Sequence, residues 1–241
     1  LYDQEMDGVF ADFKAEGITE FVLDLRYNKG GGIAPTTNLA SLIAPDVSTT
    51  DIFYENQWNE FYMEYFNSLP NGDDILRGKF YEKAENIGVN TVYVLVTGQS
   101  ASASELMING LLPYMNVEII GTTTSGKNVG SVPIEDEDDP DNTYGMLPIV
   151  LKVFNAAGQS DYDNGFTPAG ANFIDETQFA WYPLGDIRDP LLSRAIEQIT
   201  GTLPGTINNE LREFSVPSVS REIISRDTKE ALPLIFDNPL R

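Results

Sequence analysis

The sequence contains no histidine and no cysteine. Without histidine there can be no Ser-His-Asp triad, no histidine-ligated zinc site and no histidine proton shuttle. Without cysteine there can be no disulfide, no thiolate metal site and no thiol nucleophile, while the redox compartment stays open. If the protein is a serine hydrolase, its base is therefore expected to be a lysine.

Positive charge is scarce, because 15 Lys and Arg face 37 Asp and Glu, which gives a formal net charge of −22. Such a chain repels phosphate backbones and anionic membrane surfaces, so nucleic acid is not an expected partner. No apolar run is long enough to span a bilayer. The chain opens at Leu1 without a signal-peptide pattern, so we expect a fragment whose targeting segment lies upstream.

Apolar residues make up 41% of the chain, enough for a sizeable core. Strand-like runs alternate with helix-like runs, which predicts parallel βαβ units and an α/β core. The expected elements are a helix over 3–16, a strand over 21–25, a helix capped by Thr36 or Thr37, a strand over 92–96, a helix over 104–114 and a strand over 117–120. Ligands of such folds gather at the carboxyl ends of the strands, where Gly30, Gly31 and Ser102 fall.

Other segments receive structural interpretations. Residues 46–90 are rich in aromatic side chains, which we expect to cover the core more than to line a substrate groove. The acidic run 135–142 lacks the spacing of a calcium loop and is expected to be a solvated hairpin loop, so no metal site is predicted. A strand over 146–154, a turn over 155–158 and a helix from Asp189-Pro190 to Gly201 follow.

Ser102 and Lys127 are the residues best suited to chemistry. Ser102 follows an apolar strand at the start of a predicted helix, where free amides favour a developing oxyanion. The intervening helix and strand carry the chain out and back by similar lengths, so the two residues can meet at one sheet edge. A lysine activates a serine hydroxyl at neutral pH only when burial lowers the pKa of its amine, so the mechanism requires a desolvated lysine.

A structural interpretation of the same residues is also open. The segment from Ser102 to Glu105 fits a capping box, in which Ser102 caps a helix and Glu105 occupies its first turn. Lys127 would then be an ordinary loop lysine. Asp24 and Arg26, at the end of the first strand, are expected to stabilise the glycine turn and not to act in catalysis.

Three motifs in this order resemble the carboxyl-terminal processing proteases, also called tail-specific proteases. They are Leu23-Asp24-Leu25-Arg26-Tyr27-Asn28-Lys29-Gly30-Gly31, Ser100-Ala101-Ser102-Ala103-Ser104-Glu105 and Gly126-Lys127. The likeness covers residues 1 to about 200. Later segments, 164–168 and 184–186, resemble exported or lipoprotein members from Bacteroidetes-type bacteria.

The resemblance implies a crotonase-like (Clp protease/crotonase-type) α/β core with additional β-hairpins, over residues 1–201, carrying the insertion at about 46–90. The remainder, 202–241, would be a C-terminal extension packed on the core. It implies a serine endopeptidase that acts near protein carboxyl termini, needs no cofactor and works in the cell envelope, periplasmic or lipoprotein-anchored. Members often carry a PDZ domain, expected here only upstream of this fragment.

The resemblance also assigns roles to residues. Ser102 would be the nucleophile and Lys127 the general base, with the amide of Ala103 and one of Gly30 or Gly31 forming the oxyanion hole. An extended peptide is expected to lie against a strand edge, with the turn from Asn28 to Gly32 as part of the wall.

Two positions depart from the family pattern. Ser131 stands where many members have a glutamine that supports the lysine; its hydroxyl could still form a hydrogen bond, although it is shorter. Pro113 stands where some members have an acidic residue, so no carboxylate role transfers to it.

A non-catalytic module that binds peptides or protein tails on the same fold remains the rival interpretation, because a Ser102 that only caps its helix fits the sequence too. A crotonase-type acyl-CoA enzyme is a weaker alternative, since the charge of −22 disfavours an anionic partner.

Overall fold

The computed structural model describes residues 2–136, 138–139, 141–204 and 234–235. Its centre is a three-stranded parallel sheet in the order β1-β4-β5, formed by β1 (Phe21–Asp24), β4 (Thr91–Val96) and β5 (Asn116–Gly121). The predicted parallel βαβ arrangement is therefore confirmed. All three strands run the same way, so their carboxyl ends meet at one edge.

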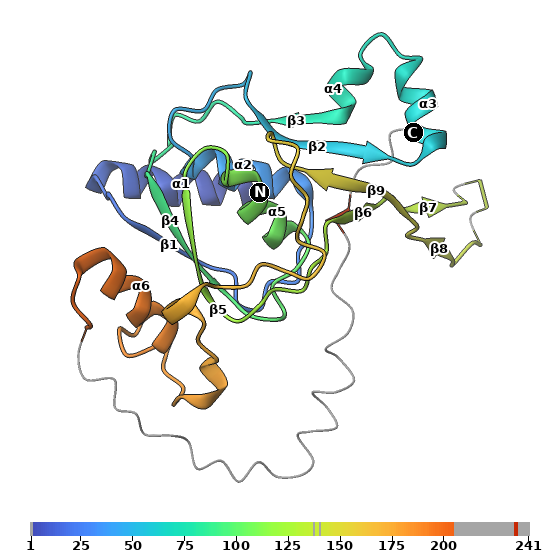
Figure 1. Cartoon of the computed structure of the whole chain (residues 1–241). Coiled ribbons are helices and arrows are strands. Elements are labelled where there is room, and N and C mark those ends of the chain that lie inside the picture. Colours follow the sequence, from blue (N-terminus) through green and yellow to red (C-terminus); the bar gives the residue numbers. More distant parts are fainter. Residues whose placement is uncertain (1, 137, 140, 205–233, 236–241) are drawn as a thin grey trace, which may run out of the picture.

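The two faces of this sheet are covered by different helices (Figure 1). Val92, Val94 and Val96 point into the main core, which includes side chains of α2 (Ile33–Ile43) and α5 (Ala103–Leu111). Tyr93 and Leu95 point the other way and pack with Leu191 and Ala195 of α6 (Pro190–Thr200). Strand β4 is apolar on both faces because its successive side chains alternate between two buried layers. Helix α1 (Tyr2–Glu16) lies beside α2.

A second, mostly antiparallel sheet has the strand order β10-β6-β9-β2-β3. Its members are β2 (Ile52–Trp58), β3 (Arg77–Lys79), β6 (Val129–Ser131), β9 (Ile149–Phe154) and β10 (Leu234–Ile235). Strand β10 pairs in parallel with β6, so a segment more than 100 residues further along the chain lies beside the strand that begins just after Lys127.

Short elements complete the described chain. Helices α3 (Glu60–Asn67) and α4 (Gly72–Leu76) lie between β2 and β3. Strands β7 (Ile134–Glu135) and β8 (Gly145–Met146) form an antiparallel hairpin, and the described residues of the acidic run, 135–136, 138–139 and 141–142, belong to it, as expected. Two single turns of 3-10 helix, η1 (Gly170–Asn172) and η2 (Glu176–Gln178), precede α6.

Most expected elements are present, and the clearest error concerns the start of α2. The helix begins at Ile33, one turn before the predicted caps. Thr36 and Thr37 lie inside it, where their hydroxyls donate to the carbonyls of Gly32 and Ile33, both at 3.0 Å. A threonine can bond back to the preceding turn as well as cap a helix, and the sequence does not distinguish the two uses. The strand expected over 146–154 is divided into β8 and β9.

The aromatic insertion covers the core, as predicted. Phe53, Trp58, Tyr62 and Phe66 are buried, and the rings of Trp58 and Phe66 meet edge-on with centroids 5.2 Å apart. Phe61 is 68% exposed and is the clearest exception.

Arg26 joins the end of β1 to the start of α6. Its buried guanidinium donates to Asp24, to Glu176 in η2 and to Asp189, the N-cap of α6, at 2.7 Å each. Burial disfavours the charged guanidinium, but the hydrogen bonds to the three carboxylates outweigh it and raise the pKa of Arg26 above its ordinary value. These contacts give Asp24 and Arg26 a structural role between β1, η2 and α6, whereas the predicted role in stabilising the glycine turn stays a prediction.

The predicted extension over 202–241 falls largely on 205–233 and 236–241, which lie outside the described residues, so the domain boundary stays a prediction. Among the described residues no helix has the length and apolar character needed to cross a membrane.

Candidate active site

Three alternating serines lie where the loop after β4 enters α5, and their hydroxyls differ in environment. The Ser100 hydroxyl donates to the carbonyl of Leu25 at 2.6 Å, and the Ser104 hydroxyl donates to the carbonyl of Asn28 at 2.9 Å. The Ser102 hydroxyl is fully buried and has no hydrogen-bond partner in the described part of the chain. The outer serines thus hold the loop against the glycine turn, while the middle one is unengaged.

The backbone of Ser102 is unusual. With φ of 59° and ψ of −112°, it adopts a conformation that residues with a side chain rarely take. Such strain persists only where the surroundings enforce it, and it is concentrated at functional sites. Ser102 and Glu105 have the predicted capping-box arrangement at the start of α5, in which the Ser102 amide donates to the Glu105 carboxylate. The Ser102 hydroxyl itself forms no hydrogen bond in the described part of the chain. The hydroxyl therefore lies at the positive end of a helix without being used to cap it.

Glu105 connects Ser102 to the loop that carries Lys127. Its buried carboxylate accepts hydrogen bonds from the amides of Ser102 (2.9 Å), Gly126 (2.6 Å) and Lys127 (2.8 Å), and from the hydroxyl of Thr124 (2.6 Å). The Ser102 and Lys127 amides donate to the same oxygen, Oε2. Two segments separated by a helix and a strand are thereby held around one carboxylate.

The loop that carries Lys127 also packs closely against residues 163–166. Gly126 has φ of +86°, and a Cβ atom there would lie 2.4 Å from the carbonyl oxygen of Asp163. Thr124 donates its amide to the carbonyl of Phe166 at 3.1 Å. Lys127 itself is half-buried, and the desolvation expected of a catalytic lysine stays a prediction.

The glycine turn after β1 lies directly against Ser102. Gly30 has φ of +102°, and a Cβ atom on it would come within 2.6 Å of Cβ of Ser102 and 3.0 Å of the Ala103 amide nitrogen. The Asn28 carbonyl accepts from the Ala101 amide at 3.1 Å, and its side-chain oxygen accepts from the Gly30 amide at 2.9 Å. Only glycine allows this approach of the two backbones.

Ser131 lies apart from these hydrogen bonds. It is the last residue of β6, and its buried hydroxyl has no partner within the described segments. Its supporting role toward Lys127 stays a prediction. The structure brings together four of the predicted site residues, namely Ser102, Ala103, Gly30 and the backbone of Lys127.

A nearby tyrosine offers no alternative base. Tyr162 is buried and stacks on Phe166 with ring centroids 4.7 Å apart. Burial, with smaller contributions from the charges of Glu105 and Asp163, raises the pKa of its hydroxyl well above the ordinary value. Tyr162 is therefore neutral at physiological pH. Across the described ranges no three acidic side chains are placed to hold a metal ion.

Sequence reasoning treated Glu105 only as a helix-start residue and missed its bonds to the lysine loop. The signal available was weak, because Thr124 and Gly126 share no recognisable spacing with a glutamate about 20 residues earlier. Such a connection exists only once β5 returns the chain to the same edge of the sheet.

Comparison with known proteins identifies the family. The model of peptidase family S41 matches residues 1–168. The chain belongs to this family. The carboxy-terminal processing protease CtpA of Bacillus subtilis (strain 168) is 28% identical over 165 residues, covering 68% of this chain and 31% of CtpA.

Solved structures extend the likeness of this S41 peptidase. A protein assigned to the S41 proteases from Bacteroides fragilis NCTC 9343 is 30% identical, with a TM-score of 0.70, over 83% of this chain and 49% of that one. The photosystem II D1 C-terminal processing protease shares the fold, with a TM-score of 0.53 at 21% identity over 79% of this chain and 42% of the other. The S41 chain thus spans between 31% and 49% of the length of these relatives.

Proposed function

We propose that this S41 peptidase is a serine endopeptidase in which Ser102 is the nucleophile and Lys127 the general base. One observation carries the proposal: of the three alternating serines, only Ser102 has an unengaged hydroxyl, and its amide shares one Glu105 oxygen with the Lys127 amide. A serine that merely capped α5 would accept a hydrogen bond from a first-turn amide on its hydroxyl. The Ser102 hydroxyl has no hydrogen-bond partner among the described residues, although Ser102 and Glu105 are arranged as in a capping box.

The proposed chemistry is acyl transfer. The Lys127 amine takes the proton of Ser102 as Oγ attacks the peptide carbonyl, and a tetrahedral oxyanion forms. Collapse breaks the C–N bond, and the protonated lysine gives its proton to the leaving amine. Water, deprotonated by the same lysine, then hydrolyses the acyl-enzyme.

The oxyanion hole is proposed to consist of the Ala103 amide and the amide of Gly31. Ala103 is the first residue of α5, where amides have no partner within the helix. Gly30, the other candidate, already donates its amide to Asn28, which favours Gly31 as the second donor. The role of Asn28 would then be to shape the turn that presents this amide.

Substrate and context follow from the family. We propose a protein substrate cleaved near its carboxyl terminus on a crotonase-like core, in the cell envelope, with any PDZ domain outside the described chain. The match to CtpA supports the cleavage site, because its name describes carboxy-terminal processing. Ser102 is fully buried, so the segments that cover its hydroxyl must move before a peptide reaches it.

Labelling of the intact protein with a serine-reactive fluorophosphonate tests this function. We expect labelling at Ser102, no labelling of Ser102→Ala, and a rate in Lys127→Ala that is lower by roughly 100-fold or more, because a positioned base contributes that much. Ser68→Ala and Lys79→Ala, on exposed side chains of α3 and β3, are the matched controls.

Normal labelling of Ser102→Ala would exclude this nucleophile. Absence of labelling in the intact protein, together with binding of an extended peptide, would favour the non-catalytic module instead.

A further inference from the structure

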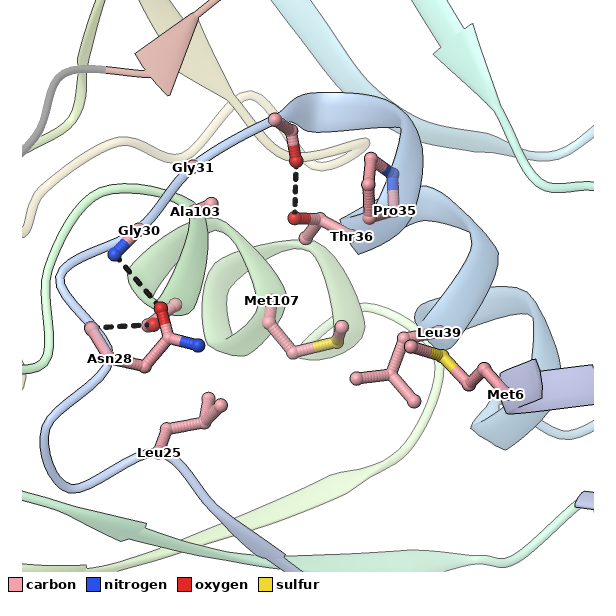
Figure 2. A pocket seen from close by; sticks show the side chains of 12 residues that line it. Met6, Leu25, Asn28, Gly30, Gly31, Pro35, Thr36, Leu39, Ala103 and Met107 are labelled. Atoms are coloured by element: carbon pink, nitrogen blue, oxygen red, sulfur yellow. Dashed lines mark hydrogen bonds between the residues drawn. The ribbon is translucent and has the colours of Figure 1, made fainter. Parts of the chain in front are cut away.

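A cavity of about 190 Å³ lies beside the glycine turn and opens at the start of α5 (Figure 2). Its lining comes from α1, the end of β1, the glycine turn, α2 and α5. Gly30, Gly31 and Ala103 form one end, while Met6 and Leu39 close the other, as Figure 2 shows. The cavity therefore begins at the amides to which the proposed oxyanion hole is assigned.

The walls of the cavity are apolar and uncharged. Leu25, Leu39, Met6 and Met107 are among the side chains that line it, and no lining residue is charged. Three polar side chains line it, and each forms at least one hydrogen bond. The Asn28 Oδ1 accepts from the Gly30 amide at 2.9 Å. Thr36 donates to the Gly32 carbonyl at 3.0 Å and Ser104 donates to the Asn28 carbonyl at 2.9 Å. A charged group placed here would lose part of its hydration and would find no side chain of opposite charge in the lining.

The volume fits one side chain and no larger ligand. Cavities that enclose whole small molecules measure about 300–1,000 Å³, whereas an apolar cavity of about 150 Å³ can hold one benzene molecule. Two methionines in the wall allow the cavity to adapt, since unbranched thioether side chains repack easily. Aliphatic and methionine side chains, and a single phenyl ring, are within this range.

We infer that this cavity receives the side chain of the residue just before the scissile bond and restricts it to uncharged apolar types. The inference rests on the proposed function. A carbonyl oxygen that faces the Ala103 and Gly31 amides leaves the side chain of its own residue next to them, and the apolar cavity is the space there. Leu39 and Met107 are the residues that set its size and polarity.

Cleavage of a peptide series by the intact protein tests the inference. The peptides differ only in the residue before the cleaved bond, which is Leu, Met, Phe, Ala, Asp or Lys. We expect kcat/KM for Leu and Met to exceed that for Asp and Lys by about 100-fold, and that for Ala by about 10-fold, the discrimination that apolar pockets reach.

Introducing a charged residue into the cavity wall should increase cleavage of one peptide relative to another, a change that misfolding cannot produce. In Leu39→Glu the preference for Leu over Lys should fall by about 10-fold or more, because the new carboxylate pairs with the substrate amine. Leu39→Lys should shift the preference toward Asp instead. Leu112→Glu, at an exposed leucine after α5, is the control and should leave the preferences unchanged.

The two hypotheses fail in different ways. Cleavage with equal rates for all six peptides, or unchanged preferences in both Leu39 variants, would overturn the inference and leave the proposed protease intact. Cleavage of no peptide, with no fluorophosphonate labelling of Ser102, would overturn the proposed function and with it the inference.

Discussion

At the scale of single residues, Glu105 is the side chain on which the site geometry depends most. All four of its recorded partners are donors, three backbone amides and one hydroxyl, so the carboxylate must act purely as an acceptor. Glu105 does not line the cavity that begins at the glycine turn. Its position between two loops makes it a positioning residue.

Glu105→Gln tests this role with almost no change in shape. The NH2 group of glutamine would face the amides of Ser102 and Lys127 in one orientation and the Gly126 amide in the other, so at least one backbone donor loses its acceptor either way. We expect the free energy of unfolding to fall by about 2–4 kcal/mol, since buried unsatisfied polar groups cost about 1–3 kcal/mol each. We also expect kcat to fall more than KM rises, because Ser102 and Lys127 lose their common anchor.

Urea unfolding and steady-state kinetics measure the two effects. Glu60→Gln, in the first turn of α3 and exposed, provides the control and should change neither quantity noticeably. A Glu105→Gln protein with normal stability and normal kcat would show that the four hydrogen bonds do not position the site.

At the scale of elements, the active site is the product of two loops that meet at one edge of the parallel sheet. The loop after β4 carries Ser102, and the loop after β5 carries Lys127. The lysine loop is held on one side by Glu105 and on the other by the segment around Asp163 and Phe166. Close packing of backbone on backbone leaves room only for glycine at position 126.

Gly126→Ala should therefore displace Lys127. The added methyl would lie 2.4 Å from the Asp163 carbonyl oxygen, in addition to the cost of φ at +86°. We expect a loss of about 2–3 kcal/mol in unfolding free energy and a fall in kcat of at least about 100-fold, because misplacement by about 1 Å costs that much.

Gly158→Ala separates backbone strain from steric contact. Gly158 has a similar φ of +72°, but a Cβ atom there would meet nothing within 4 Å. We expect it to lose only about 1 kcal/mol and to keep full activity. If Gly126→Ala behaved like Gly158→Ala in both assays, the packing of the lysine loop would not matter for the site.

At the scale of the whole molecule, the protein has a net charge of −22, whereas no charged residue lines the cavity beside the glycine turn. The long-range field and the local pocket thus select for different properties of a substrate. If the proposed function holds, the field attracts positively charged segments before contact, whereas the cavity selects one apolar side chain after contact.

This separation predicts how salt affects catalysis. For peptides with lysines placed several residues from the cleaved bond, kcat/KM should fall by several-fold between about 20 mM and about 500 mM NaCl, because the field is screened. For peptides with aspartates at the same positions it should rise, and for neutral peptides it should change little. Equal salt dependence for all three peptides would rule out steering by the net charge.

How far the sequence anticipates the structure depends on whether a signal is local. Helix α6 matches its prediction from Asp189 to Gly201, because Asp189 accepts from the first-turn amides and Gly201 takes the left-handed conformation at the other end. The start of α2 was misplaced because threonine serves equally well as a cap and inside a helix. The prediction is correct where the residue types are compatible with one backbone conformation, as at the ends of α6. It is wrong where a residue type fits two, as with the threonines of α2.

The amino-acid sequence by itself determined the absence of histidine and thiol chemistry, the alternation of strands and helices, and the candidates Ser102 and Lys127. The tertiary structure alone decided which serine keeps an unengaged hydroxyl and that Glu105 joins the two loops. It also decided that side chains from three helices enclose an apolar cavity beside the glycine turn. The physical reason is that composition and periodicity act along the chain, whereas hydrogen-bond partners and cavity walls come from residues that only folding brings together.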